Sequence, residues 1–213
     1  NKVCEILGDD VFINLSMAPV FPYNYANGRR ICCDSYYKIK DSKYVLNSLT
    51  YGFWESEIYD CIDPDHIVLW GRDGKAKEGE ARARLLSGVV TGGSFLSGDN
   101  FVSPAGKPDK AFERYEELLG NKAIIDIAKS GVPFEGQISS KCEYAANVFT
   151  LEKDGKTYIA VFNYSFIPKT FSIKLPYENC SVTNLFTGKT DTKNKTMLVT
   201  VPASDAVIFE VTK

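Results

Sequence analysis

Up to about residue 131 the chain alternates short apolar runs with amphipathic stretches, which is the pattern of successive βα units. Four such units cannot close a parallel barrel, which needs eight strands, and an open sheet built from them would leave apolar edges uncovered. We therefore expect an α/β region that is the second half of a (β/α)8 TIM barrel. Extended segments are predicted at residues 11–21, 29–34, 58–70 and 94–101, and helices at 42–54 (with Ser42 as N-cap), 78–92 and 108–131.

A different pattern begins near residue 132. The stretch "NVFTLEKDGKTYIAVFNYS" is typical of a hairpin, because an Asp154–Gly155 turn separates two alternating strands. The stretches "TFSIKL", "SVTNLFTGK", "TMLVTV" and "AVIFEVT" follow at the strand-and-turn spacing of an antiparallel sandwich. We predict two domains: residues 1–131 form the C-terminal half of a catalytic barrel, and residues 132–213 form a C-terminal antiparallel β-sandwich.

The composition argues against several kinds of partner. The 213 residues are 44% hydrophobic and 24% charged, as in ordinary globular proteins. A net charge of −2 gives no electrostatic basis for binding nucleic acid or an anionic membrane surface, and no apolar run reaches the ~20 residues that span a bilayer. The chain opens with Asn1 and carries no leader pattern, so we expect a portion of a longer protein. A removed signal peptide would also explain this start, and secreted, periplasmic and cytoplasmic locations all stay open.

Neither a metal site nor a cofactor is expected. The six cysteines show no zinc-ligand spacing, and His66 is the only histidine, whereas a metal site needs three or four ligands. We expect the cysteines to be buried packing residues, Cys32 and Cys33 among them, and His66 to make a local structural hydrogen bond. A metal-dependent barrel hydrolase is disfavoured for the same reason.

Aspartates stand at or near the ends of the predicted strands, where barrel enzymes carry their catalytic groups. The stretch "RRICCD" ends at Asp34, and a strand period of two places Arg30 and Asp34 on one face. Both could then reach a sugar at the barrel mouth. Carboxylates with one histidine and no metal pattern suit glycoside hydrolysis, in which two acids flank the scissile bond. The alternative for any one of these aspartates is a helix cap or a loop-fixing hydrogen bond.

Three motifs carry a family resemblance: "SMAPVFPYNYANGRRICCDSYY", "YDCIDPDHIVLWG" and "EGEARARLLSGVVTGGSFLSGDNF". In this order they resemble the later half of retaining α-galactosidases and α-N-acetylgalactosaminidases, most of all their bacterial branch. The resemblance covers about residues 8–101 and continues more loosely through the sandwich. It implies a retaining glycoside hydrolase that cleaves terminal α-linked galactose or a related sugar and needs no cofactor.

The resemblance also implies roles for particular residues. Asp34 is expected to be the general acid/base, with Arg30 holding it and the sugar's 2-substituent. Asp65, the second Asp of Asp63-Pro64-Asp65, is expected in the sugar site, holding that arginine or a sugar hydroxyl. Met17 stands where relatives contact the 2-position of the sugar, and since Met is a poor hydrogen-bond acceptor the choice of sugar stays open.

The family's nucleophile ends the fourth barrel strand, which would precede Asn1. We therefore expect this chain alone to be inactive, with a carbohydrate substrate and the missing N-terminal half of the barrel as its partners. The alternative is a non-catalytic carbohydrate-binding or structural module on the same fold.

Overall fold

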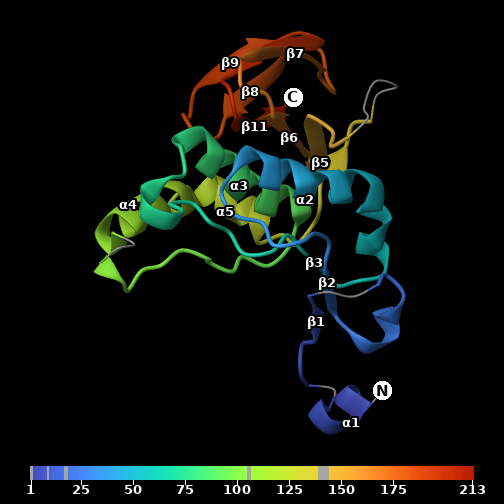
Figure 1. Cartoon of the computed structure of the whole chain (residues 1–213). Coiled ribbons are helices and arrows are strands. Elements are labelled where there is room, and N and C mark those ends of the chain that lie inside the picture. Colours follow the sequence, from blue (N-terminus) through green and yellow to red (C-terminus); the bar gives the residue numbers. More distant parts are fainter. Residues whose placement is uncertain (1, 9, 17–18, 105–106, 139–143) are drawn as a thin grey trace.

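The structure, a computed structural model, describes residues 2–8, 10–16, 19–104, 107–138 and 144–213. Short strands lie toward the N-terminus, helices in the middle and β-strands at the C-terminal end (Figure 1). The helices are α1 (Lys2–Leu7), α2 (Ile39–Gly52), α3 (Glu78–Thr91), α4 (Pro108–Leu119) and α5 (Lys122–Ala128), with short 3-10 turns η1 (Pro22–Tyr25), η2 (Phe53–Glu57) and η3 (Arg72–Gly74). The strands are β1 (Asn14–Leu15), β2 (Gly28–Arg30), β3 (Cys61–Asp63), β4 (Glu135–Gly136), β5 (Val148–Lys153), β6 (Lys156–Asn163), β7 (Lys169–Lys174), β8 (Cys180–Asn184), β9 (Thr190–Lys193), β10 (Thr196–Val201) and β11 (Asp205–Thr212).

The first sheet is parallel, with the order β1-β2-β3. Its last two strands are joined through a helix, α2, which is how a barrel wall is built. The C-terminal strands form an antiparallel sheet of order β4-β5-β6-β11-β8-β9 and a two-stranded sheet of β7 and β10. The predicted fold class, a barrel half followed by a β-sandwich, is therefore confirmed. The predicted division at residue 131 falls between α5 and β4 and stays a prediction.

The strands of the parallel sheet are shorter than predicted. β2 ends at Arg30, so the prediction of one strand that runs through Asp34 is wrong. The backbone amide of Ile31 still donates to the carbonyl of Asp63, but the chain then bends, and the amide of Ser35 donates to a side chain instead. The amide of Ser35 therefore has a side-chain acceptor in place of the neighbouring strand that a continued β2 would offer.

Residues 94–101 do not form the predicted fourth strand. Within the described part of this segment, the one β-type contact is a parallel bridge between Ile67 and Ser97. The carboxylate of Asp99 instead accepts the backbone amides of residues 69–71 at 2.7, 3.0 and 2.7 Å. Asp99 therefore fixes a loop, which is the alternative role for such an aspartate.

Helix α3 is the most deeply buried helix and packs against both α2 and β11. It confirms the helix predicted at residues 78–92 to within one residue at its end. Several of its apolar side chains have no solvent exposure: Ala81, Ala83, Leu85, Leu86, Val89 and Val90.

Two other helix boundaries differ from the prediction. The helix predicted at 108–131 is divided into α4 and α5, because the side chain of Asn121 accepts the amide of Ile124 and starts a new helix. Helix α2 begins at Ile39, and Ser42 is not its N-cap: the carboxylate of Asp41 accepts the amide of Lys38 at 3.1 Å.

The hairpin predicted around Asp154 and Gly155 joins β5 to β6. Both turn residues have positive φ, 51° and 74°, as a two-residue hairpin turn of this twist requires. Apolar side chains of β6, β7, β8, β10 and β11 fill the space between the two sheets.

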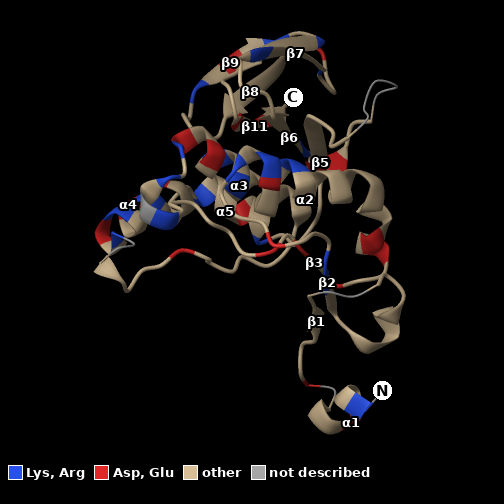
Figure 2. Cartoon of the chain, viewed as in Figure 1, with Lys and Arg blue, Asp and Glu red and all other residues tan. Residues whose placement is uncertain are grey.

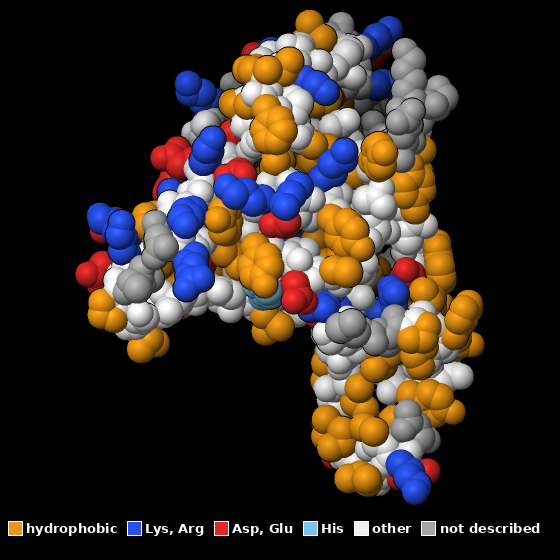
Figure 3. All heavy atoms as spheres, in the orientation of Figure 1, with side chains coloured by type: hydrophobic (Ala, Val, Ile, Leu, Met, Phe, Trp, Pro, Cys, Tyr) orange, Lys and Arg blue, Asp and Glu red, His pale blue; other side chains and the backbone are white. Residues whose placement is uncertain are grey.

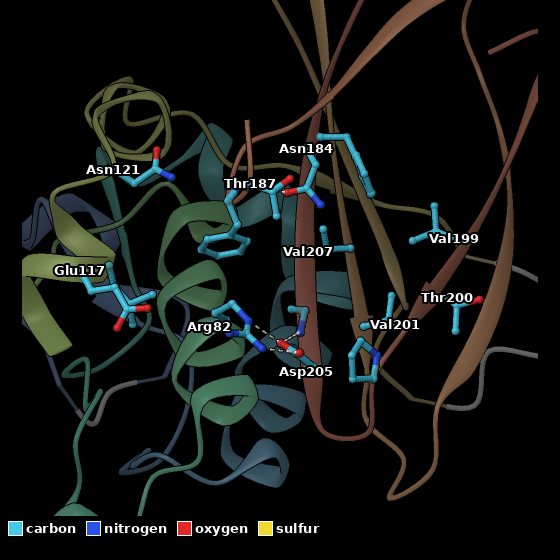
Figure 4. A pocket seen from close by; sticks show the side chains of 15 residues that line it. Arg82, Glu117, Asn121, Asn184, Thr187, Val199, Thr200, Val201, Asp205 and Val207 are labelled. Carbon is cyan, nitrogen blue, oxygen red and sulfur yellow. Dashed lines mark hydrogen bonds and ion pairs between the residues drawn. The ribbon is translucent and has the colours of Figure 1, made fainter. Parts of the chain in front are cut away.

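An ion pair joins helix α3 to the sandwich. Arg82 donates from Nε and Nη2 to the two carboxylate oxygens of Asp205, at 3.0 and 2.6 Å (Figure 4). The backbone also comes close here: a Cβ on Gly79 would lie 2.8 Å from the carbonyl oxygen of Ser204. The helical layer and the sandwich therefore meet in a close contact, in which this ion pair adds to an apolar core shared by the helices and strands β5, β6 and β11.

Charge and apolar surface are distributed differently. In Figure 2 acidic and basic residues are interspersed over the helices and the sandwich. Apolar side chains gather on the N-terminal arm, which projects from the body (Figures 1 and 3). Ile6, Phe12 and Phe21 are 80%, 58% and 81% exposed there. Of the helices that the structure describes, none combines the length and apolarity needed to cross a membrane.

Candidate active site

The carboxyl ends of β2 and β3 bring together three of the predicted site residues. The Nη1 atom of Arg30 lies 3.1 Å from Oδ1 of Asp34 and 2.9 Å from Oδ1 of Asp65. β2 and β3 pair Arg30 with Asp63, so the parallel ladder itself sets the arginine beside the loop that carries Asp65. The guanidinium also donates from Nε to the carbonyl of Ser16, at 3.1 Å.

Asp65 is buried and held on both oxygens. Oδ1 accepts from Arg30 and lies 3.2 Å from Nδ1 of His66, while Oδ2 accepts the amide of Ser35 at 2.6 Å. Burial by itself would raise the pKa of Asp65, but the hydrogen bonds from Ser35, His66 and Arg30 outweigh it and hold the pKa below its ordinary value. Asp65 is therefore an ionised anchor.

The loop that presents Asp65 is tightly constrained. Asp65 itself has a positive φ of 67°, which is uncommon for a residue other than glycine. Oδ1 of Asp63 accepts the amide of Asp65 at 2.7 Å, and Oδ2 of Asp63 accepts from the side chain of Asn14. Asp63 thus braces the turn, the role that the sequence allowed as its alternative.

Arg30 is a firmly charged group between two carboxylates. Burial would lower its pKa, but the hydrogen bond to Asp65 and the negative charges of Asp65 and Asp34 raise it above the ordinary value. A permanently charged, planar donor suits the recognition of carboxylates.

Asp34 differs from Asp65 in its exposure. Its side chain is 65% exposed, against 6% for Asp65, and it borders an open hollow of about 630 Å³. Ser16, Cys33 and Tyr44 also line this hollow. Asp34 therefore has one ion-pair partner, Arg30, and an otherwise exposed carboxylate at the edge of this hollow.

The remaining predicted residues have mixed outcomes. Met17 lies outside the described residues. Cys32 is buried as expected, and burial raises the pKa of its thiol to about 11, but Cys33 is exposed, so its assignment as a packing residue is wrong. His66 makes the local hydrogen bond that was expected of it. Among the described residues no group of three or more His, Cys, Asp or Glu side chains could hold a metal ion.

The sequence reasoning assigned no role to Arg84, which lies directly behind the Asp65 loop. The residue has no solvent exposure, and its Nη2 atom lies within 2.9 Å of the carbonyl oxygens of both Pro64 and His66. A signal for this was present, because Arg84 stands three residues after Ala81 and four before Gly88, on the apolar face of α3. An arginine on a buried helix face needs polar partners.

Comparisons with known proteins agree with this fold. Residues 150–211 match the family described as the alpha galactosidase C-terminal beta sandwich domain. No curated protein sequence matches the chain.

Solved structures of several glycoside hydrolases share the fold of nearly the whole chain. Alpha-galactosidase I from Mortierella vinacea aligns with a TM-score of 0.66 and 14% identity, over 89% of this chain and 55% of that one. A GH27 β-L-arabinopyranosidase from Geobacillus stearothermophilus gives a TM-score of 0.78 and 14% identity, over 100% and 52%. An isomalto-dextranase from Arthrobacter globiformis aligns with a TM-score of 0.69 and 14% identity, over 99% of this chain and 39% of that one.

The chain thus spans about half the length, or less, of the structures it matches. Those structures bear the names of enzymes for different sugars, and the predicted bacterial branch stays a prediction. Residues 150–211 are thus similar to the alpha galactosidase C-terminal beta sandwich domain, and the chain shares its fold with part of these glycoside hydrolases.

Proposed function

We propose that this chain supplies the general acid/base of a retaining α-glycosidase. The observation that carries the proposal is the Arg30 guanidinium, which lies between the buried Asp65 and the exposed Asp34 at the carboxyl ends of β2 and β3. Barrel enzymes place their catalytic groups at this end of the strands. The kinship of the sandwich to alpha-galactosidases supports a glycosidase rather than another barrel enzyme.

Asp34 has two tasks in this mechanism. It first gives a proton to the glycosidic oxygen as the bond from that oxygen to the anomeric carbon breaks and a nucleophilic carboxylate bonds to that carbon. It then takes a proton from the water that attacks the same carbon and releases the sugar from the covalent intermediate. Its exposed position allows contact with both the leaving group and the water.

The nucleophile is assigned to a segment outside these residues. Both oxygens of Asp65 are taken, by Arg30 with His66 and by Ser35, and both oxygens of Asp63 are likewise engaged. A carboxylate that is held in this way is a poor nucleophile, because attack would break its hydrogen bonds. Asp65 is assigned the task of orienting Arg30, and Arg30 that of holding Asp34 and a polar 2-substituent of the sugar.

The substrate assigned to the completed enzyme is a terminal α-linked galactose or a closely related sugar. L-arabinose and D-galactose in their pyranose forms differ only in the group at carbon 5, so one pocket shape can accept either sugar. Structures named as an alpha-galactosidase and as a β-L-arabinopyranosidase both share the fold of this chain.

The partner assigned to the chain is the other half of the barrel. β1 is an edge strand of the three-stranded sheet, and the arm beside it exposes Ile6, Phe12 and Phe21. Apolar surface beside an open parallel edge is a surface that a further βα segment would cover.

The test uses the completed enzyme, in which this chain is joined to a preceding barrel half, and Asp34→Ala. Because an activated aryl glycoside needs little proton donation, its glycosylation step should be nearly unaffected, while kcat/KM for an alkyl galactoside falls by about 10²–10⁴-fold. Azide, which attacks the intermediate without a base, should restore turnover of the aryl substrate.

Asp126→Asn is the matched control, since Asp126 is an exposed aspartate on α5 that pairs with Lys122. An equal loss on both substrates, or no azide rescue, would remove Asp34 from the acid/base role. The isolated 213-residue chain should hydrolyse no aryl galactoside.

A carbohydrate-binding module is the second candidate. The observation that favours it is that Asp34 is, within the described residues lining the hollow, the single carboxylate there. Sugar binding by the completed protein with no turnover of any aryl glycoside would favour this reading over the enzyme.

A further inference from the structure

Arg84 is a buried cation without a carboxylate partner in its hydrogen bonds. It has no solvent exposure, and its Nη2 atom donates to three successive carbonyl oxygens, those of Pro64, Asp65 and His66, at 2.9, 3.3 and 2.8 Å. Nη1 donates to Oγ of Ser87 at 2.8 Å. A buried charge of this kind is costly to desolvate, so its hydrogen bonds to these carbonyl oxygens are needed to offset that cost.

The three carbonyls belong to the turn that carries Asp65. Three oxygens in a row can converge on one donor only if the chain curls around it, and the positive φ of Asp65 provides this curl. The guanidinium therefore fills the inside of the turn, while the Asp65 side chain points outward to Arg30 and Ser35.

The residue does not touch the hollow itself. The hollow is lined by Ser16, the end of β2, the turn after it and Tyr44, and Arg84 is not among these residues. A connected series of contacts nevertheless runs from Arg84 through the turn to Asp65, then to Arg30 and finally to Asp34, with the last two steps at 2.9 and 3.1 Å.

We propose that Arg84 is a positioning residue: it holds the carbonyls of residues 64–66 so that Asp65 fixes Arg30 and, through it, the orientation of Asp34. The effect on catalysis rests on the proposed function, whereas the effect on the turn does not.

The thiol of Cys32 offers a measure of the turn that needs no activity. Its Sγ donates to the carbonyl of Pro64, an oxygen that Arg84 also holds, and Ser35 donates to that sulfur. Because the thiol is buried it should react slowly with an alkylating reagent, and release of the turn should expose it.

The first experiment measures the alkylation of Cys32 by iodoacetamide in the 213-residue chain, resolved by mass spectrometry. Arg84→Met should speed the reaction at Cys32 by about tenfold or more, because local opening replaces a closed turn. Arg84→Lys, which keeps the charge but loses the fork of donors, should give a smaller increase.

Lys122→Met is the matched control. It also replaces a cation by methionine, but Lys122 is exposed on α5 and pairs with Asp126, so Cys32 should react within about twofold of the unmodified chain. If Arg84→Met does not fold, the comparison of Arg84→Lys with Lys122→Met decides alone. An unchanged rate at Cys32 in both Arg84 variants overturns the proposal.

The second experiment tests the catalytic consequence in the completed enzyme. Arg84→Lys should lower kcat for an alkyl galactoside by about tenfold while KM changes by less than about twofold, and should affect an activated aryl substrate less, as for Asp34→Ala. A merely structural role would lower kcat equally for the alkyl and the aryl substrate. If Cys32 responds but no variant of the completed protein is active, the proposed function fails and the positioning of the turn stands. If activity is present and neither readout moves, the positioning role fails.

Discussion

The ion pair between Arg82 and Asp205 provides a quantitative test of how the helical layer and the sandwich are joined. Asp205 is buried, with 5% of its side chain exposed, and Arg82 is 28% exposed. Removing one partner of a fully buried pair costs about 3–5 kcal/mol, since an unpaired charge is left behind. Because water reaches part of Arg82, we expect Arg82→Met to lower the free energy of unfolding by about 2–3 kcal/mol.

The measurement is urea unfolding followed by circular dichroism, together with thermal unfolding. For a chain of this size the expected loss corresponds to a fall in Tm of roughly 4–12 °C. Asp205→Asn should cost less than Arg82→Met, because the amide keeps the shape and leaves Arg82 able to reach water. The double variant Arg82→Met with Asp205→Asn should cost less than the sum of the two, since the contact is shared.

Lys122→Met is the matched control, because Lys122 pairs with Asp126 on an exposed face of α5. An exposed pair of this kind contributes about 0–1 kcal/mol. If Arg82→Met costs no more than Lys122→Met, or if the two effects at Arg82 and Asp205 add fully, the buried pair is not what joins the two parts.

Three further predictions concern the site. Asp65 has a lowered pKa in the folded chain, so its pairing stabilises the fold above its ordinary pKa of 3.8 and is lost as the pH falls through the lower folded value; Asp65→Asn should flatten the acid limb of a stability–pH curve. Gly93→Ala should destabilise more than Gly131→Ala in urea unfolding, since a Cβ on Gly93 would lie 1.9 Å from the Ile62 carbonyl oxygen, whereas Gly131 has open space and only a positive φ to oppose the change. Cys33 should be alkylated well before Cys32 at about pH 8, because Cys33 is exposed and burial raises the pKa of Cys32 to about 11; equal rates would contradict the burial of Cys32.

Local patterns in the sequence predicted the regular elements well. The apolar spacing of residues 78–92 gave the extent of α3, and the Asp154–Gly155 turn gave the β5–β6 hairpin. Both signals depend on residues close together in the chain, where periodicity and turn chemistry apply directly.

The details of the site depend on contacts between distant residues. β2 ends at Arg30, the chain bends at residues 32–33, and the amide of Ser35 donates to Asp65, thirty residues away, so Asp34 lies after the bend and not in the strand. The carboxylate of Asp99 is likewise turned toward residues 69–71. A strand pattern does not show which backbone amides donate to distant side chains. The sequence therefore predicts Arg30, Asp34 and Asp65 as neighbours, but it does not predict the path of the chain between them.

Helix α3 has a consequence for exchanging parts between relatives. Two arginines that are two positions apart serve different neighbours: Arg82 binds Asp205 of β11, and Arg84 holds the turn after β3. A chimera that imported a foreign sandwich would have to bring a residue able to accept the fork of Arg82, or the helix would settle in a new position. Any such shift would displace Arg84 with it, so a change in the sandwich would alter the positions of Asp65, Arg30 and Asp34 at the other side of the helix.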